Sequence, residues 1–281
     1  MMLSMNLSTQ KVYVCLESSQ LGDNIAWLPY IDLARQKYNW EVYTNFYYKD
    51  LFSDVYPELH YSIPSTYDKI INIDVTDREK PLQWSGANAL GIDYVEIRPR
   101  FNVSKLTKSF DPTVTFSEFG SNYAKSWTNP YGWLKVIKYI NSIGYTPISI
   151  SKEVTTLSNI KNCTGSDLKT VCDLIYSSQV YIGVSSGLAW LAWCLGVPVI
   201  MLSGHTHPYF EFTENCIRIG PPEGICRGCY NNNLLEVKWE DMWCPHHKNT
   251  YRQHECTYSI EPSLVINAIK TVFSGKSSPK I

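Results

Sequence analysis

The chain has 281 residues, of which 44% are apolar, 14% aromatic and 18% charged, with 25 basic against 26 acidic side chains. This composition excludes a disordered chain, because a nearly neutral sequence so rich in apolar residues can bury a core, and its length suits one large domain or two smaller ones. The net charge of −1 argues against a polybasic nucleic-acid binder. No stretch approaches the ~18 apolar residues of a membrane span, and the N-terminus lacks the pattern of a secretory signal. We therefore expect a cytoplasmic protein without a membrane partner.

The first third of the chain alternates between predicted strands and helices. Short apolar runs bounded by polar turns predict the strands, and apolar residues at helical spacing predict the helices. In chain order the expected elements are a strand at 12–16, a glycine-bearing loop at 21–24, a helix at 25–37, strands at 41–44 and 69–73, and a short helix at 81–90. Strand, loop, helix and strand in this order form the unit that builds a parallel sheet.

Prolines and mixed charges at 98–112 predict a linker, after which the alternation restarts. The expected strands lie at 113–116, 145–150, 180–184 and 197–202, and the expected helices at 130–143, 166–176, 187–195 and 261–273. We therefore predict an α/β protein with two Rossmann-like, doubly wound domains, at 1–105 and 106–281. Because such sheets bind ligands beyond the carboxyl ends of their strands, the candidate site lies in the loops 17–24, 117–125, 185–187 and 203–212.

Four of the nine cysteines crowd into one polar stretch near the C-terminus. Cys226 and Cys229 form a C-x2-C knuckle, and Cys244 and Cys256 follow after gaps of 14 and 11 residues. Two thiolates three residues apart can hold one side of a tetrahedral ion, and two later ones can complete a four-thiolate site for zinc or iron. Four protein ligands leave no open position, so we predict a structural site in a finger at 224–258, in which Gly228 allows the knuckle to turn.

Three histidines lie close to these cysteines in the sequence, namely His246, His247 and His254. Each of them could replace one cysteine, because imidazole is also a common zinc ligand. We interpret them as solvated loop residues and prefer the all-cysteine set. The alternative to a metal site is a group of free thiols in one polar loop.

Three further features suit a phosphate-bearing ligand or proton transfer. Ser185, Ser186 and Gly187 lie at a strand-to-helix junction, where they can either cap the helix or leave room for an anion at its positive end. Asp23 can cap the first helix or act as a general base. Lys125 follows a predicted strand and suits a diphosphate, although most lysines are merely solvated.

Long motifs in the same order resemble the bacterial autotransporter heptosyltransferases, which are relatives of the lipopolysaccharide heptosyltransferases and have the GT-B fold. The likeness extends from about residue 12 to 272. The motifs that carry it are Leu21-Gly-Asp-Asn-Ile-Ala-Trp-Leu-Pro-Tyr30, the stretch from Lys125 to Trp133, Ser185-Ser-Gly-Leu-Ala-Trp-Leu-Ala-Trp193, and the tail with Cys226-x2-Cys229, Trp243-Cys-Pro-His246 and Glu255-Cys-Thr257.

This resemblance implies an inverting glycosyltransferase that moves a heptose from an ADP-linked donor to serine hydroxyls of a protein, without a catalytic divalent cation. It implies an acceptor-side first domain, a donor-binding second domain, structural iron in the finger and a homo-oligomer. Residue by residue, it makes Asp23 the catalytic base. The implied substrate-binding residues are Gly22 and Asn24 beside it, Lys125, Ser185, Ser186 and Gly187 at the diphosphate, and Ser203 and His205 in the stretch from Met201 to Phe212 at the nucleotide end. The implied metal ligands are Cys226, Cys229, Cys244 and Cys256.

The chain departs from the family at its beginning. Members that modify proteins carry an additional N-terminal β-rich domain that helps to dock the acceptor, whereas here the first predicted strand begins near Val12, so we expect that domain to be absent. The acceptor is then a protein serine, a glycan, a small molecule or a hydroxymethylated base in phage DNA, the last served by a local basic patch of Arg100, Lys105 and Lys108. Alternatives of another class are a metal-stabilised nucleotide-binding module without catalysis and, less favoured, a redox protein.

Overall fold

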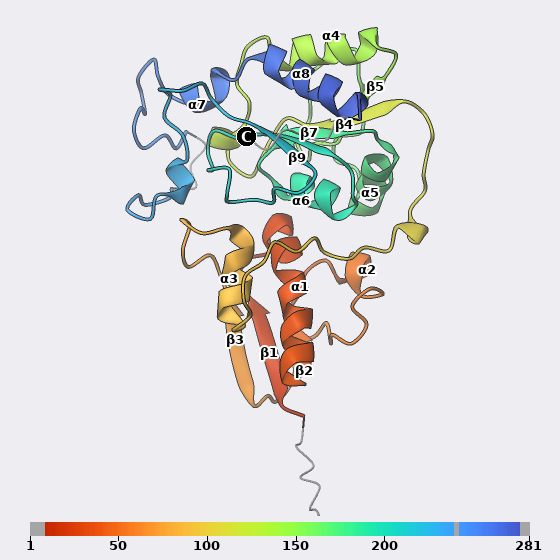
Figure 1. Ribbon diagram of the computed structural model, residues 1–281, viewed down its shortest axis with the longest axis vertical. Coiled ribbons are helices and arrows are strands. Elements are labelled where there is room, and N and C mark those ends of the chain that lie inside the picture. The colour runs from red at the N-terminus through yellow and green to blue at the C-terminus, as the bar shows by residue number, and fades with distance from the viewer. Residues whose placement is uncertain (1–8, 239–241, 276–281) are drawn as a thin grey trace, which may run out of the picture. The chain divides into compact units, whose positions relative to one another are not determined.

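The computed structural model describes residues 9–238 and 242–275 and divides the chain into two units (Figure 1). The first unit comprises residues 9–76 and 82–102, and the second comprises 77–81 and the described residues from 103 onward. The main division therefore lies close to the expected boundary at 105, but the short segment 77–81 belongs to the second unit. Residues 1–8 and 276–281 of the expected domains, and residues 239–241 of the expected finger, lie outside the described residues.

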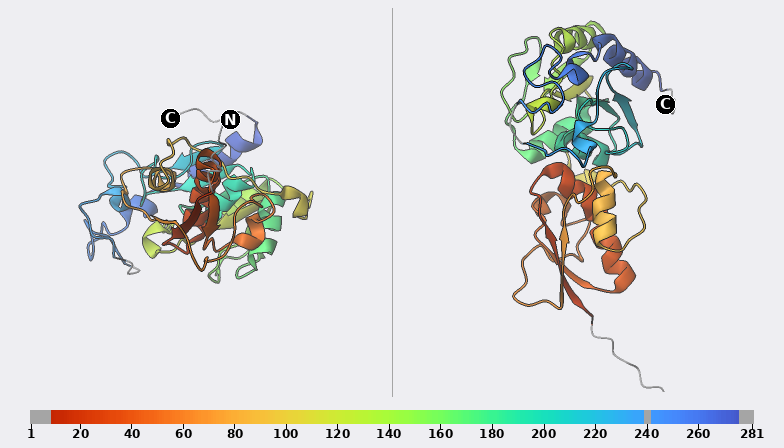
Figure 2. Two further views of the ribbon diagram at one scale, coloured as in Figure 1. Left: turned by 90° about the horizontal axis from the view of Figure 1, so that it is seen from below. Right: turned by 90° about the vertical axis from the view of Figure 1, so that its left-hand side faces the viewer.

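The first unit is a small parallel sheet with helices against one face. Its strands are β1 (Lys11–Leu16), β2 (Glu41–Thr44) and β3 (Lys69–Ile73), in the order β2-β1-β3. Helices α1 (Leu21–Tyr38) and α3 (Leu82–Ala89) pack side by side on this face (Figures 1 and 2), and α2 (Lys49–Phe52) is a single short turn. The predicted parallel strand–helix–strand unit is confirmed.

Helix α1 begins earlier than the sequence predicts. The stretch 21–24, expected to be a loop, is its first turn. The N-cap residue Gln20 provides no side-chain cap; instead the Asn24 amide donates to the carbonyl oxygens of Ser18 at 2.7 Å and Gln20 at 3.0 Å. The start escaped prediction because helical apolar spacing begins only at Ile25 and no N-cap residue of the preferred types marks the boundary.

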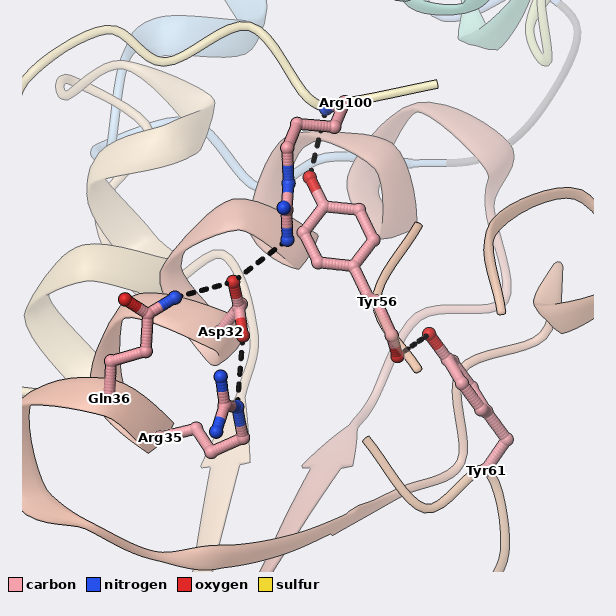
Figure 3. A network of polar contacts seen from close by, with 6 residues as sticks. All are labelled: Asp32, Arg35, Gln36, Tyr56, Tyr61 and Arg100. Carbon is pink, nitrogen blue, oxygen red and sulfur yellow. Dashed lines mark hydrogen bonds and ion pairs between the residues drawn. The ribbon is translucent and has the colours of Figure 1, made fainter. Parts of the chain in front are cut away.

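A buried carboxylate ties α1 to the end of the first unit (Figure 3). Asp32 accepts hydrogen bonds from Arg35 Nε at 2.9 Å, Gln36 Nε2 at 2.8 Å and Arg100 Nη2 at 3.1 Å. The Arg100 guanidinium also lies 4.5 Å from the centre of the Tyr56 ring, and its backbone N–H donates to the Tyr56 hydroxyl at 2.9 Å. The last residues of this unit are therefore fixed by polar contacts to α1.

We expect Asp32→Ala to lower the free energy of unfolding of the first unit by about 2 kcal/mol, since the aspartate accepts charge-assisted hydrogen bonds in a largely buried position. Arg100→Met should cost less than about 1 kcal/mol, because the Arg100 side chain is 60% exposed. Urea unfolding followed by circular dichroism measures both changes. Equal losses in the two variants would contradict the assignment of Asp32 as the centre of the network.

The second unit is a larger doubly wound sheet, with six parallel strands in the order β6-β5-β4-β7-β8-β9. Helices α4 and α8 cover one face and α5 and α6 cover the other (Figures 1 and 2). Its strands are β4 (Thr113–Ser117), β5 (Thr146–Ser149), β6 (Lys161–Asn162), β7 (Tyr181–Val184), β8 (Val199–Leu202) and β9 (Cys216–Ile219). Its helices are α4 (Gly132–Ser142), α5 (Leu168–Ser177), α6 (Gly187–Cys194), α7 (Glu255–Tyr258) and α8 (Pro262–Phe273), with short 3-10 turns at Val103–Lys105, Tyr123–Lys125 and Cys229–Asn231.

Most elements of this unit agree with the predictions, and the α/β class with parallel sheets is confirmed. Helix α6, whose residues are nearly all apolar, is buried from Ala189 to Cys194. The sequence missed β6, β9 and α7 because they are short, and because Arg218 interrupts the apolar run of β9. Within the described residues, no helix is long and apolar enough to cross a membrane.

Candidate functional site

Most predicted donor-binding residues follow three neighbouring strands of the second unit. Lys125 lies in the loop after β4, Ser185 to Gly187 follow β7, and Ser203 and His205 follow β8. Since β4, β7 and β8 are adjacent and parallel, their carboxyl ends lie at one edge of the sheet. This edge is where doubly wound sheets bind ligands.

At the junction between β7 and α6, neither serine hydroxyl caps the helix. Ser186 occupies the N-cap position but makes no side-chain cap, and the Ser185 hydroxyl donates to the carboxylate of Glu211. Ser186, Gly187 and Leu188 are half-buried, so the start of α6 is open to solvent. The first N–H groups of a helix have no partners within the helix, and they can bind an anion.

Lys125 reaches this edge from a short 3-10 turn. The Asn122 side chain caps the turn by accepting from the Ala124 N–H at 2.8 Å. Gly120 lets the turn pack closely, because a Cβ at that position would lie 3.1 Å from the Lys125 Cβ. The Lys125 ammonium lies 5.9 Å from the centre of the Tyr230 ring. The Lys125 ammonium therefore lies in the loop after β4, and β4 is adjacent to β7, the strand that leads into α6.

Ser203 and His205 are buried, at 6% and 5% exposure. The Ser203 hydroxyl is paired with the Thr206 hydroxyl at 2.8 Å. Burial, together with the charges of Lys125 and His254, lowers the pKa of His205 to about 3, so its imidazole stays neutral. Both residues thus shape the loop after β8, and neither offers a positive charge to a phosphate.

The candidate base lies in the first unit, on the first turn of α1. Asp23 is half-buried and accepts a hydrogen bond from the Ser18 hydroxyl. Its negative charge, after burial, helps to raise the pKa of Tyr48. Asp23 does not occupy the N-cap, so the capping alternative is wrong; its carboxylate is oriented by Ser18 and partly open to solvent.

The two residues beside Asp23 are both packed into the fold. Gly22 is buried, and so is Asn24. Besides donating to the turn before the helix, the Asn24 amide accepts from the Tyr47 N–H at 3.2 Å. Asn24 therefore holds the segment around Asp23, and a contact of either neighbour with substrate stays a prediction.

The four clustered cysteines line a single small cavity in the second unit. Burial, and then the negative charges of neighbouring thiolates, raise the pKa of Cys229 to about 12 and also raise the pKa of Cys256. Burial, and then the charge of Glu255, raise the pKa of Cys226. The cavity thus gathers four soft donors that repel one another when ionised, an arrangement that suits a cation. As predicted, Gly228 adopts a left-handed conformation, with φ of +72°.

The three nearby histidines differ from the expectation that all are solvated. His246 is exposed, but His247 is half-buried and His254 is 6% exposed. Within the described residues, the buried Nε2 atom of His254 has no hydrogen-bond partner, and this residue lines the cysteine cavity. The prediction of a solvated His254 is wrong, because the residue is buried and its imidazole is hydrogen-bonded to the backbone of Trp243.

A second set of possible ligands overlaps with the cysteines. Ligand atoms of Cys226, His247 and Glu255 lie within 4.8 Å of one another. Glu255 is buried and also pairs with Arg252, whose Nε lies 2.9 Å from its carboxylate. The structure therefore brings the expected cysteines to one cavity, but among the described residues the ligand atoms that lie within 4.8 Å of one another are those of Cys226, His247 and Glu255. A site of four cysteines stays a prediction.

The cavity is joined to the loop after β8. It is also lined by His205 and Ala124, which belong to the donor-side loops. A Cβ on Gly204 would lie 2.2 Å from the carbonyl oxygen of Cys256, so only glycine allows these two backbones to approach so closely. Substitutions of the cysteines should therefore also alter the conformation of the loop after β8, the predicted nucleotide end.

Sequence reasoning missed two parts of this region. Arg78, in the segment 77–81, donates to the carbonyl oxygens of Asn232 at 3.0 Å and Leu235 at 2.6 Å and lies 5.6 Å from the centre of the Tyr230 ring. Glu211 is buried in the loop after β8. No local pattern marks Arg78, whereas an acid flanked by Phe210 and Phe212 was a signal for a buried charge.

Comparisons with known proteins find relatives over most of the chain, although no family model matches it. The chain is 30% identical to the autotransporter heptosyltransferase Aah of Escherichia coli, over 96% of this chain and 76% of that protein. The crystal structure of TibC, a dodecameric iron-containing heptosyltransferase, in complex with ADP-D-β-D-heptose matches 95% of this chain and 77% of TibC with a TM-score of 0.88 and 25% identity. The ADP-heptose lipopolysaccharide heptosyltransferase II of E. coli matches 95% of this chain and 99% of that one, with a TM-score of 0.57 and 13% identity, and shares the fold alone.

Proposed function

The chain belongs to the autotransporter heptosyltransferase family and is thus a glycosyltransferase, and from this we propose that it transfers a heptose-like sugar from an ADP-linked donor to a hydroxyl group with inversion. The observation that carries the proposal is the edge of the second unit where Lys125 and the open start of α6 follow adjacent strands. This edge combines a side-chain cation with backbone donors. A diphosphate needs both.

We propose that the second unit binds the donor. The backbone N–H groups of Ser186 and Gly187 and the Lys125 ammonium would hold the diphosphate. The stretch from Met201 to Phe212, with Ser203 and His205 as buried supports, would form the nucleotide end. In TibC the bound donor is ADP-D-β-D-heptose, which supports the same donor class here.

We propose that Asp23 of the first unit takes the proton of the acceptor hydroxyl. The freed oxygen would attack the anomeric carbon, the bond to the donor phosphate would break, and the nucleoside diphosphate would leave with the bonding electrons. A carboxylate held by Ser18 yet open to solvent suits this role. We propose a serine hydroxyl of a protein as acceptor, and a hydroxymethylated base in DNA is the alternative that the assay below includes.

We propose that the cysteine cavity holds a structural metal, because all four cysteines line it together with His254, whose buried Nε2 atom has no hydrogen-bond partner among the described residues. We propose that Cys226, Cys229, Cys244 and Cys256 would hold iron, or zinc, which would cross-link the finger to the loops beside Ala124 and His205. The iron in TibC supports iron, and the dodecameric state of TibC supports a homo-oligomer. Nine free thiols fit a reducing, cytoplasmic location.

The proposal is tested by incubating the protein with a panel of nucleotide sugars and measuring the release of nucleoside diphosphate. ADP-heptose should give the fastest release, and it should accelerate when a serine-containing acceptor protein is added. Mass spectrometry of protein, glycan and hydroxymethylated DNA acceptors identifies the product. If no nucleotide sugar is turned over but nucleotides bind, the protein is a binding module and the proposed function is wrong.

Lys125→Met should raise the dissociation constant for ADP at least about tenfold, because one charge-assisted contact to the diphosphate is lost. Isothermal titration calorimetry measures the change. Lys135→Met, which removes a lysine of the same unit that lies over the Tyr131 ring, is the matched control and should bind as the wild type does. Similar losses in both variants would contradict a specific role for Lys125.

A further inference from the structure

The loop after β8 buries a carboxylate that the proposed mechanism does not use. Glu211 is 3% exposed. Its Oε1 atom accepts hydrogen bonds from the Ser185 hydroxyl and, at 2.9 Å, from the Thr206 hydroxyl, and its Oε2 atom lies 2.8 Å from Arg218 Nη2. We infer that Glu211 is a positioning residue of the donor site, which holds the loops after β7 and β8 in their binding arrangement; the inference rests on the proposed function.

The three partners of Glu211 come from consecutive strands. Ser185 directly follows β7, Thr206 lies in the loop after β8, and Arg218 lies in β9. These strands are neighbours in the sheet, in the order β7-β8-β9. One carboxylate therefore connects segments from three neighbouring strands, at the edge where the donor is proposed to bind.

Aromatic packing fixes the carboxylate relative to α6. Phe210 and Phe212, on either side of Glu211, are both buried. The Phe212 ring stacks on Trp193 at a centroid distance of 4.6 Å and meets the Trp190 ring at 5.1 Å in an edge-on arrangement. Both tryptophans belong to α6, so the position of Glu211 follows that of the helix whose start is the proposed anion site.

A buried ion pair is a poor means of stabilising a fold. The cost of removing both charges from water roughly offsets their attraction, and well-packed apolar side chains often stabilise as much. Glu211 and Arg218 together are neutral, so the pair adds no net repulsion toward a diphosphate. Unlike an apolar side chain, the carboxylate also fixes the orientation of its neighbours, because it accepts hydrogen bonds from two hydroxyls at defined positions.

The arrangement also decides which groups can contact phosphate. A serine hydroxyl has one proton, and that of Ser185 is donated to Glu211, so this hydroxyl can only accept from a ligand. Phosphate oxygens are acceptors too. They are therefore left to the backbone N–H groups at the start of α6 and to Lys125, and Glu211 acts on donor binding through the position of Ser185.

The inference is tested with Glu211→Gln, Ser185→Ala and the double variant, with ADP as the probe in calorimetry. Glutamine keeps the shape of the side chain but removes the charge that pairs with Arg218. We expect ADP to bind about tenfold more weakly to E211Q and about threefold more weakly to S185A. The double variant should bind no more weakly than E211Q, because residues that act through one contact are not additive.

Thr115→Val is the matched control. It removes a buried hydrogen bond of 2.9 Å to Ser178 in the same sheet, near the amino end of β7. It should lower the melting temperature about as much as E211Q but leave ADP binding unchanged. Unchanged binding of ADP to E211Q, or losses that add in the double variant, would overturn the inference.

A readout without ligand separates this inference from the proposed function. Hydrogen exchange measured by mass spectrometry over residues 185–190 should be about tenfold faster in E211Q than in T115V, since the start of α6 loses its anchor. Equal exchange would overturn the role of Glu211. If the wild type binds neither ADP nor any other nucleotide, the proposed function fails, while the exchange comparison still decides whether Glu211 positions this segment.

Discussion

Asp23→Asn is expected to lower kcat by about a thousandfold, because a positioned general base contributes roughly 10²–10⁴-fold to such a transfer. Asparagine keeps the shape and can still accept from Ser18, but it cannot take the acceptor proton. The dissociation constant for ADP should stay within about twofold of the wild type, since the residues proposed to bind the donor belong to the other unit. Initial rates with ADP-heptose, together with calorimetry on ADP, measure the two quantities.

Asp50→Asn is the matched control for this variant. Asp50 lies in the first turn of α2, in the same unit, and like Asp23 it is an acidic residue at the start of a helix. Both variants lose a favourable interaction with a helix dipole, which is worth about 0.3–1 kcal/mol. A comparable fall of kcat in both, or a D23N protein that has lost ADP binding together with turnover, would show that Asp23 supports the fold and is not the base.

Cys229→Ser and Cys256→Ser are expected to lose the metal and to lower the melting temperature by about 10 °C. A ligand present at a thousand times its dissociation constant stabilises the folded state by about 4 kcal/mol. For a unit of this size, losing that free energy lowers the melting temperature by about 10 °C. Elemental analysis of the purified protein should give close to one iron or zinc per chain. Calorimetric unfolding before and after chelation should reproduce the loss.

The other cysteines and the histidines of the finger provide the controls. Cys163 is half-buried and Cys172 fully buried, and both lie outside the cavity, so Cys163→Ser and Cys172→Ala should keep the metal. His247→Gln should also keep it if four sulfurs are the ligands. Loss of the metal in H247Q with retention in C229S would instead select the set of Cys226, His247 and Glu255.

The fold was predictable where a segment makes its own contacts with the core. Helix α4 carries apolar residues such as Val136 and Ile140 at helical spacing, and both are fully buried. The start of helix α5 is marked by the N-cap residue Asp167, whose side chain accepts a hydrogen bond from the Thr170 N–H. Strand β9 was missed because Arg218 interrupts its apolar pattern, and that arginine pairs with Glu211 of the preceding loop.

The site was predictable to the extent that its residues follow strands. The common location of Lys125, Ser185 and Ser203 was predictable, because parallel strands bring their carboxyl ends to one edge. That they bind a donor stays a prediction. What each side chain does there was not predictable. The Ser185 hydroxyl is bound to Glu211 and His205 is buried and neutral, and both facts depend on neighbours that are far away in the sequence.

The sequence by itself determined the two parallel arrays and the edge of the second sheet that carries the candidate residues, because periodicity and local spacing encode these features. The finger of four cysteines stays a prediction. Only the tertiary structure decided that segment 77–81 joins the second unit, that His254 is buried beside the cysteine cavity, and that Glu211 connects three strands. The physical reason is the same in each case. Burial and hydrogen-bond partners arise from long-range contacts, and no local pattern records them.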